Sequence, residues 1–378
     1  MTRQRDAQRF RTVGDGSGLA ASDSFYPEEI QLALRNRGMP LEALRYSLTP
    51  TGMHFLLIHF DIPEVDAGKW QLKIGGLVAN PVNLTLEDIK QRPSQTLAVT
   101  MECAGNGRAL MNPRPLSQPW LLEAVGTAEW TGTPLRGILE EAGIAPNAVE
   151  ILFTGLDQGV QGNEVQYYQR SLSIDEATRD EMLLAYEMNG EALQPQHGYP
   201  LRLIVPGWYG MTSVKWLDRI EAIAKPFDGY QMSATYRFSQ TKNDPGEPVT
   251  LIRVRALMSP PGIPDFMTRT RLVEPGPVSI TGRAWAGRQQ VAGVEVSTDG
   301  GSTWAPASLD VRGDEPVDGP VSPFAWRPWS FQWDARPGRY ILLVRATDSQ
   351  GNVQPVSQPW NFQGMGNNIA QRVEVLVE

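Results

Sequence analysis

Cysteine and histidine are scarce in this sequence, and their scarcity excludes several kinds of site. The 378 residues contain one cysteine, Cys103, and three histidines, His54, His59 and His197. One thiol forms no internal disulfide, and it is too few for a cysteine-rich zinc site, an iron–sulfur cluster or a covalently attached c-type haem. We therefore expect no disulfide scaffold, no iron–sulfur cluster and no haem.

Net positive charge and long apolar runs are also missing. The 34 Lys and Arg residues against 42 Asp and Glu residues give a net charge of −8, so no overall positive field attracts nucleic acid or an anionic membrane. No segment reaches the roughly 18 to 20 uninterrupted apolar residues that a membrane-spanning helix needs. The sequence thus predicts a water-soluble protein with no nucleic-acid partner and no membrane partner.

Residues 1–44 form a polar N-terminal extension, which we expect to be partly disordered. A short helix is predicted over 27–38, because Pro27, Glu28 and Glu29 are helix-start signals. The extension opens with arginines but never reaches the apolar core of a signal peptide. The compartment therefore stays open: cytoplasmic if the sequence is complete, periplasmic or otherwise exported if a signal peptide was removed.

Glycine and proline are abundant, with 36 and 30 residues, which favours strands, turns and ordered loops over a helical bundle. The length fits two or three domains at about 150 residues each. Within residues 45–240, the patterns predict a mixed α/β domain. Strands are expected over 54–63, 70–78, 96–103, 149–155 and 201–207, and helices over 84–93, 134–143 and 175–190.

The character of the sequence changes near residue 240. The polar, Pro- and Gly-containing segment 239–249 indicates a domain boundary. Short apolar runs separated by turns follow it, and the Asp299-Gly300 pair predicts a tight hairpin. About seven strands at this spacing are typical of an immunoglobulin-like β-sandwich, here without its disulfide. The predicted fold class is α+β: a mixed α/β domain over 45–240 followed by a β-sandwich over 241–378.

Cys103 lies in the run MECAGNGR (101–108), where an apolar strand gives way to a glycine-rich loop. Such a strand end is a place where backbone amides hold ligands. Three interpretations fit this position. Cys103 is a buried structural residue, a nucleophile with His59 or His197 as its base, or a thiolate ligand of a soft transition metal.

Three other segments supply polar groups to the same kind of site. His197 and Arg202 flank a strand start in HGYPLR (197–202), where they can grip an anionic group. The segment GMTSVKW (210–216) adds Ser213 and Lys215, and FTGLDQG (153–159) places Asp157 on a glycine-flanked loop. Each segment alone is a weak signal, but their order along the chain is specific.

From about residue 45 onward, the chain resembles the sulfite oxidase family of molybdopterin-dependent enzymes. The matching strings are CAGN (103–106), HGYPLR (197–202), VKW (214–216), RAW (283–285), DGGSTW (299–304) and AWRPW (325–329). The resemblance implies that 45–240 is a molybdopterin-binding catalytic domain with the sulfite oxidase fold, and that 241–378 is a dimerisation domain. The motifs around Cys103, 56–63 and 197–216 look closest to the sulfane dehydrogenase and bacterial sulfite dehydrogenase branch.

The resemblance also implies the cofactor and its ligands. Cys103 is expected to be the protein's one bond to molybdenum, which carries a single molybdopterin. The positions that match cofactor-binding residues of the family are His59, Asp157, His197, Arg202, Ser213, Val214 and Lys215. We add Arg108 to this set because of its charge and its place in the Cys103 loop. The expected catalytic residues are Tyr236, Trp120 and Arg202.

Two departures from the family pattern bear on the substrate. The position where sulfite oxidases usually carry an arginine reads Leu57, and the usual Arg-Arg pair after the cysteine reads Gly107-Arg108. Another cation, Arg202 or Arg327 of the C-terminal domain, is then expected to neutralise an anionic substrate. The physiological substrate stays open.

The resemblance predicts oxidation of sulfite or a related sulfur compound by oxygen-atom transfer. Electrons are expected to pass to an external cytochrome-like carrier, and the protein is expected to be a homodimer. One alternative is a molybdopterin-dependent reductase of sulfoxide or nitrate. An alternative of a different class is a non-catalytic protein or a thiol hydrolase, with Cys103 structural or nucleophilic.

Overall fold

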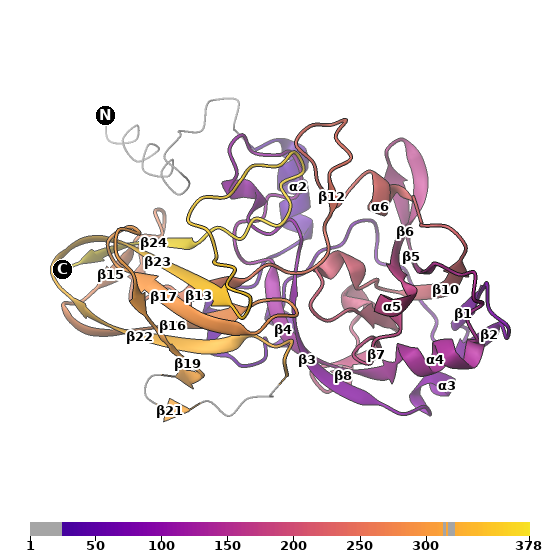
Figure 1. The fold of residues 1–378 in the computed structure, drawn as a ribbon. Coiled ribbons are helices and arrows are strands. Elements are labelled where there is room, and N and C mark those ends of the chain that lie inside the picture. The colour runs from indigo at the N-terminus through magenta and orange to yellow at the C-terminus, as the bar shows by residue number, and fades with distance from the viewer. Residues whose placement is uncertain (1–24, 313–314, 317–321) are drawn as a thin grey trace.

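The computed structural model describes residues 25–312, 315–316 and 322–378 (Figure 1). The disordered start predicted for the N-terminal extension falls mainly on residues 1–24, outside the described residues. The helix predicted over 27–38 is present as α2 (Pro27–Arg35), with Pro27, Glu28 and Glu29 in its first turn. Of the described helices, none is long and apolar enough to cross a membrane.

The N-terminal domain is built on two sheets with a shared apolar core (Figure 1). One has the order β2-β1-β10-β5-β6, with β1 (Gln71–Gly76), β2 (Val82–Thr85), β5 (Glu150–Gln161), β6 (Glu164–Ser173) and β10 (Leu217–Ile223). The other has the order β3-β4-β7-β8, with β3 (Gln95–Glu102), β4 (Val125–Pro134), β7 (Leu183–Met188), β8 (Glu191–Ala192), and β9 (Arg202–Ile204) paired to β7. The helices of this domain are α3 (Leu86–Lys90), α4 (Leu135–Ala142), α5 (Ile174–Ala177) and α6 (Tyr230–Ser233).

Two predicted elements of this domain are wrong, and each has a physical reason. The helix predicted over 175–190 stops at Ala177, and Leu183–Met188 forms β7 instead. Almost every residue of β7 is buried, so pairing on both sides with β4 and β9 overrides the helix signal. The strand predicted over 54–63 is irregular chain, with a single bridge from Leu56 to Arg37. Its apolar residues Phe55 and Ile58 are buried without joining a sheet.

The C-terminal domain is a sandwich of two sheets, as predicted. One has the order β13-β16-β22-β19, with β13 (Arg255–Ser259), β16 (Gly276–Trp285), β19 (Ser308–Leu309) and β22 (Arg327–Ala335). The other has the order β14-β15-β24-β23-β17-β18, with β14 (Ile263–Pro264), β15 (Arg271–Val273), β17 (Val291–Ser297), β18 (Ala305–Pro306), β23 (Gly338–Asp348) and β24 (Gln371–Val377). Small two-stranded pairs join β11 (Arg237–Phe238) to β12 (Glu247–Pro248) and β20 (Val311–Arg312) to β21 (Glu315–Pro316).

The tight hairpin predicted at Asp299-Gly300 is also wrong. Strands β17 and β18 are joined by the longer loop 298–304. The Asp299 carboxylate accepts hydrogen bonds from the hydroxyls of Ser297 and Thr303 and from the Thr303 backbone, which gives the loop a compact shape of its own. The domain boundary at 240 lies between β11 and β12 and stays a prediction.

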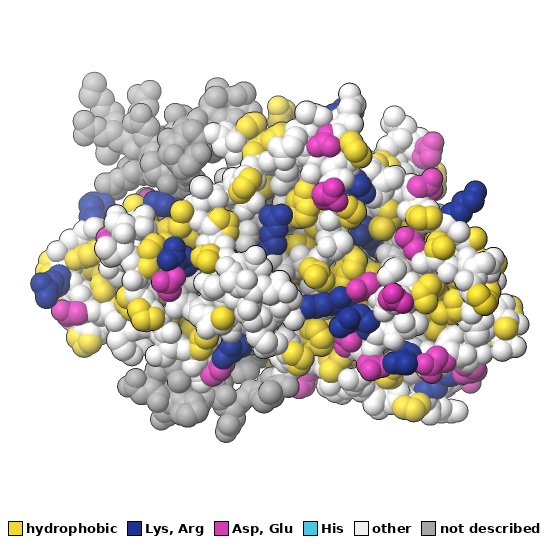
Figure 2. All heavy atoms as spheres, in the orientation of Figure 1, with side chains coloured by type: hydrophobic (Ala, Val, Ile, Leu, Met, Phe, Trp, Pro, Cys, Tyr) yellow, Lys and Arg dark blue, Asp and Glu magenta, His cyan; other side chains and the backbone are white. Residues whose placement is uncertain are grey.

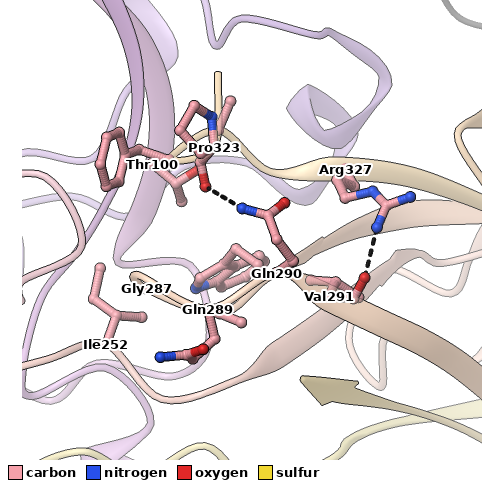
Figure 3. Close-up of a pocket in the computed structure, with 12 residues that line it drawn as sticks. Thr100, Ile252, Gly287, Gln289, Gln290, Val291, Pro323 and Arg327 are labelled. Atoms are coloured by element: carbon pink, nitrogen blue, oxygen red, sulfur yellow. Dashed lines mark hydrogen bonds between the residues drawn. The ribbon is translucent and has the colours of Figure 1, made fainter. Parts of the chain in front are cut away.

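The two domains are packed closely along a seam. One apolar cluster contains Leu44 of the N-terminal extension, Val125 of β4, and Trp285 and Trp326 of the sandwich. Figure 3 shows a small pocket on this seam, where Gln290 of the sandwich donates to the carbonyl of Pro323 near Thr100 of β3. On the face shown in Figure 2, acidic and basic side chains are interspersed.

Candidate active site

An open cavity lies at the end of β3, where several distant segments of the chain meet. The predicted site residues that line it are His59, Cys103, Asp157, His197, Arg202, Ser213, Lys215 and Tyr236. Its other lining residues are His54, Phe55, Leu56, Leu57, Met101, Tyr168, Gly210 and Met211. Sequence positions 54 to 236 thus converge on one cavity with Cys103 in its wall.

The Cys103 loop begins directly after β3 and is fixed by local hydrogen bonds. The backbone amide of Cys103 donates to Ala124, and the amide of Asn106 donates to the Cys103 carbonyl. The Asn106 side chain donates to Leu122 and accepts from the amide of Ala124. Gly107 has a φ of 86°, which an L side chain rarely adopts, so the turn requires a glycine.

Cys103 is buried, and burial raises the pKa of its thiol, while the positive charge of Arg108 opposes that rise. A cysteine nucleophile needs a lowered pKa to be reactive near neutral pH. No three His, Cys, Asp or Glu side chains of the described chain cluster as a metal site. Cys103 therefore offers the cavity a single thiol donor.

Arg202 begins β9 and brings a buried positive charge to the cavity. Its guanidinium donates to the carbonyls of His197 (2.9 Å) and Ser213 (3.1 Å), and it lies 4.7 Å from the ring of Trp130. Burial lowers its pKa to about 9. Its Nε has no hydrogen-bond partner, and no described carboxylate forms an ion pair with it. Such a cation is ready to receive an anionic ligand.

Lys215, two residues before β10, and Asp157, in the middle of β5, both line the cavity. Lys215 Nζ donates to the carbonyls of Leu57 (2.7 Å) and Gln196 (3.1 Å), and burial followed by the charge of Arg202 lowers its pKa to about 7. Burial raises the pKa of Asp157 to about 7, against the opposing effect of Lys215. The Asp157 Oδ1 atom is buried without a hydrogen-bond partner among the described residues.

His54 and His197 form a pair that the sequence patterns did not reveal. Their rings are nearly perpendicular, with centroids 5.9 Å apart. The Nε2 atom of each ring is buried, and no group in the described part of the chain forms a hydrogen bond with it. Burial lowers the pKa of His54 to about 4 and that of His197 to about 2, so both rings are neutral at neutral pH. They present neutral hydrogen-bonding groups to the cavity.

Tyr236 belongs to a polar cluster at the cavity wall. Its hydroxyl lies 2.6 Å from Nε2 of His59, whose ring stacks on Tyr168 at 4.6 Å. The guanidinium of Arg170 lies 5.4 Å from the Tyr236 ring. Burial raises the pKa of Tyr236 to about 12, so the hydroxyl keeps its proton at neutral pH.

Tyr168 and Arg170 were not among the predicted residues. They lie two positions apart on β6 and therefore point to the same face of the sheet, which is the only sequence signal that marks them. Arg170 is buried, and it forms no ion pair with a described carboxylate.

Four residues named in the sequence analysis do not line the cavity. Val214 is buried in the core between Ser213 and Lys215. Trp120 packs in the same apolar cluster as Cys103. Arg108 is buried beside the Cys103 loop, where it donates to the carbonyls of Gln363 and Gln118. Their site roles stay predictions. Arg327, the other cation expected to neutralise the substrate, lies on the domain seam, where it donates to the carbonyl of Val291 (Figure 3). It is also paired with Asp310.

Comparison with known families and proteins decides the family. An oxidoreductase molybdopterin binding domain matches residues 59–231, and a Mo-co oxidoreductase dimerisation domain matches residues 257–378. Sulfite oxidase of Arabidopsis thaliana is 33% identical over 371 residues, which is 89% of this chain and 91% of that protein. The chain belongs to the sulfite oxidase family. The predicted family and the predicted fold class are therefore confirmed.

Other members of the family show how far the similarity reaches. Mitochondrial sulfite oxidase of Macaca fascicularis is 33% identical over 87% of this chain, but the chain spans only 62% of that protein. An NADH nitrate reductase of Arabidopsis thaliana is 30% identical, and the chain spans 40% of it. The crystal structure of the sulfane dehydrogenase SoxCD from Paracoccus pantotrophus matches with a TM-score of 0.76 and 26% identity, covering 96% of this chain and 95% of that one.

Proposed function

We propose that this protein is a molybdenum- and molybdopterin-dependent oxidoreductase that oxidises sulfite or a related sulfur compound. The observation that carries the proposal is the single thiol of Cys103 in a cavity walled by buried cations and unpartnered polar atoms. When bound, the molybdenum group supplies oxygen-atom transfer and accepts two electrons.

The cavity fits such a cofactor. A buried polar atom without a partner costs about 1 to 3 kcal/mol, so a site with several of them is completed by a ligand. Here these atoms are His54 Nε2, Asp157 Oδ1, His197 Nε2 and Arg202 Nε. Molybdopterin carries ring nitrogens and a phosphate, which suit exactly such a mixture of donors, an acceptor and positive charge.

We assign a cofactor-binding role to each lining residue from its charge and its position in the cavity. Cys103 provides the sulfur that binds the metal, since soft metals prefer thiolate. Arg202 and Lys215 face the phosphate, because both are buried cations without a carboxylate partner at ion-pairing distance. Asp157 and His197 supply the acceptor and the neutral imidazole for the pterin ring.

Two features of the cavity bear on the substrate: the hydroxyl of Tyr236, and Leu57 at the position where sulfite oxidases usually carry an arginine. With the Nε2–H tautomer of His59 donating to the Tyr236 oxygen, the Tyr236 hydroxyl, which keeps its proton, would be able to donate a hydrogen bond to an oxygen bound in the cavity. Leu57 contributes an apolar side chain to the cavity wall, and its carbonyl is occupied by Lys215. Because Arg202 and Lys215, the two cations among the described lining residues, are assigned to the phosphate, the cavity wall offers the substrate no further positive charge, which favours sulfur compounds of lower charge than free sulfite.

Partners follow from the same reasoning. Because we expect neither a haem nor an iron–sulfur cluster in a chain with one cysteine and three histidines, we propose an external cytochrome-like carrier as electron acceptor. The similarity of residues 257–378 to a dimerisation domain supports a homodimer. Light scattering after size-exclusion chromatography measures that state directly.

The test begins with molybdenum content and with the reduction of cytochrome c by sulfite or thiosulfate. Cys103→Ser is compared with Thr100→Ser, a buried change on the neighbouring β3 that does not reach the cavity. We expect metal and activity in the wild type and in Thr100→Ser, and loss of both in Cys103→Ser. A metal-loaded protein that oxidises none of these sulfur compounds contradicts the proposal.

Reduction of nitrate or a sulfoxide is the second candidate. It is favoured by the similarity to nitrate reductases and by Leu57, which removes a cation that sulfite binding normally uses. Reduced viologen dye with nitrate or dimethyl sulfoxide distinguishes the two directions. The raised pKa of Cys103 disfavours the thiol hydrolase alternative, because a thiol that keeps its proton is a poor nucleophile.

A further inference from the structure

Glu102, the residue before Cys103, is a buried carboxylate held by the other domain. Its side chain is 2% exposed and forms an ion pair with Arg255 of β13. Trp285 of β16 donates its indole N–H to the second carboxylate oxygen at 2.8 Å, and Asn106 of the Cys103 loop donates to the first at 3.0 Å. Two groups of the sandwich thus meet on the residue adjacent to the metal ligand.

Arg255 extends this contact to the far side of the same loop. It is fully buried, and besides Glu102 it donates to the carbonyl of Asn367 at 2.6 Å. The Asn367 side chain donates to the carbonyl of Gly107 at 2.7 Å, and the amide of Gly366 donates to the carbonyl of Ala104 at 2.7 Å. The C-terminal domain therefore contacts the loop on both sides of Cys103: at Glu102 before it, and at Ala104 and Gly107 after it.

Stability alone is a weak reason for such an arrangement. Taking two charges out of water costs several kcal/mol each, and well-packed apolar residues often stabilise a fold as much or more. What a hydrogen-bonded charge pair provides is a fixed geometry, because Arg255 has a planar, directional set of donors. Its two partners here are the strand end before Cys103 and the segment that holds Gly107.

We propose that the Glu102–Arg255 pair, with Trp285, is a positioning device through which the C-terminal domain fixes the conformation of the Cys103 loop. The C-terminal domain, which matches a dimerisation domain, then also determines the position of the Cys103 thiol in the N-terminal domain. None of these three residues lines the cavity, so they act through the loop and do not touch substrate or cofactor.

The test uses the cofactor-free protein, so that it does not depend on the proposed activity. Cys103 is the only cysteine of the chain, so its alkylation by iodoacetamide reports the loop without interference. Trp285→Phe removes one N–H donor and keeps an aromatic ring, and Arg255→Lys keeps the charge but loses the two-pronged contact. We expect alkylation about tenfold faster in both, equivalent to about 1.4 kcal/mol for opening of the loop.

A second interdomain ion pair provides the matched control. Arg288 of the β16–β17 connection binds Glu176 of α5, and it has no contact with the Cys103 loop. Arg288→Gln is expected to lower the thermal midpoint as the other variants do, while alkylation stays within about twofold of wild type. In the metal-loaded protein, Arg255→Lys and Trp285→Phe should also change the thiolate-to-molybdenum absorption band, and Arg288→Gln should not.

The outcomes separate positioning from general stabilisation. If Trp285→Phe and Arg255→Lys lower the thermal midpoint but leave the alkylation rate at that of Arg288→Gln, the contact is structural only and the inference is wrong. Should Arg255→Lys fail to fold, the milder Trp285→Phe decides alone. Faster alkylation in a protein that never oxidises a sulfur compound supports the positioning role and contradicts only the proposed function.

Discussion

Replacing Asp157 by asparagine should stabilise the cofactor-free protein, and the gain should grow with pH. Asp157 is 5% exposed, and burial raises its pKa from 3.8 to about 7. Between pH 3.8 and about 7, Asp157 is deprotonated in the unfolded chain but still protonated in the folded protein. The free energy of unfolding therefore decreases as the pH rises through this range. Three pKa units at 1.36 kcal/mol each give a penalty of about 4 kcal/mol above pH 7 and almost none near pH 4.

Asparagine keeps the shape of the side chain and carries no charge, so it removes this penalty. Urea unfolding of wild type and Asp157→Asn from pH 4 to 8.5 measures the difference, with the exposed Asp334→Asn as control. We expect the two curves to meet near pH 4 and to separate by up to about 4 kcal/mol at pH 8. A difference that is the same at every pH, or a less stable Asp157→Asn at pH 8, would refute the argument that burial dominates this site.

Three further predictions concern the loaded enzyme. Tyr236→Phe keeps the ring but removes the hydroxyl near His59, so kcat should fall about a hundredfold with KM changed little, in steady-state sulfite oxidation; an unchanged kcat removes Tyr236 from the catalytic residues. Leu57→Arg restores a cation to the cavity wall and should lower KM for sulfite about tenfold, whereas an unchanged KM shows that position 57 does not face the substrate. Arg202→Met should lower pterin and molybdenum content at least tenfold by elemental analysis and by fluorescence of released pterin, and normal content contradicts its assignment to the phosphate.

Local sequence identified the centre of the site but not its surroundings. The glycines after Cys103 predicted a turn at a strand end, and β3 and Gly107 have that geometry because the turn requires a positive φ. His197 and Arg202 are five residues apart, so their proximity also followed from the sequence. The family resemblance added Tyr236, which lies far along the chain from Cys103.

The remaining features depend on contacts between distant segments. The run at 183–188 is apolar except for Glu187, so its periodicity does not distinguish a helix from a strand, and pairing with β4 and β9 decides between them. Arg170 lies on a strand whose sequence carries no motif. Glu102 and Arg255 are 153 residues apart, and ordinary charged residues give no sign of pairing at that separation.

That separation also orders events during the synthesis of the protein. Gly107 is held by Asn367, which lies 260 residues later in the chain. At about 5 to 20 residues per second, a ribosome needs roughly 13 to 52 seconds to make the intervening segment. Throughout that interval the loop exists without Asn367, and for more than half of it Arg255 has not been made either. The loop that carries Cys103 is therefore complete only after the sandwich has been translated and has folded against it.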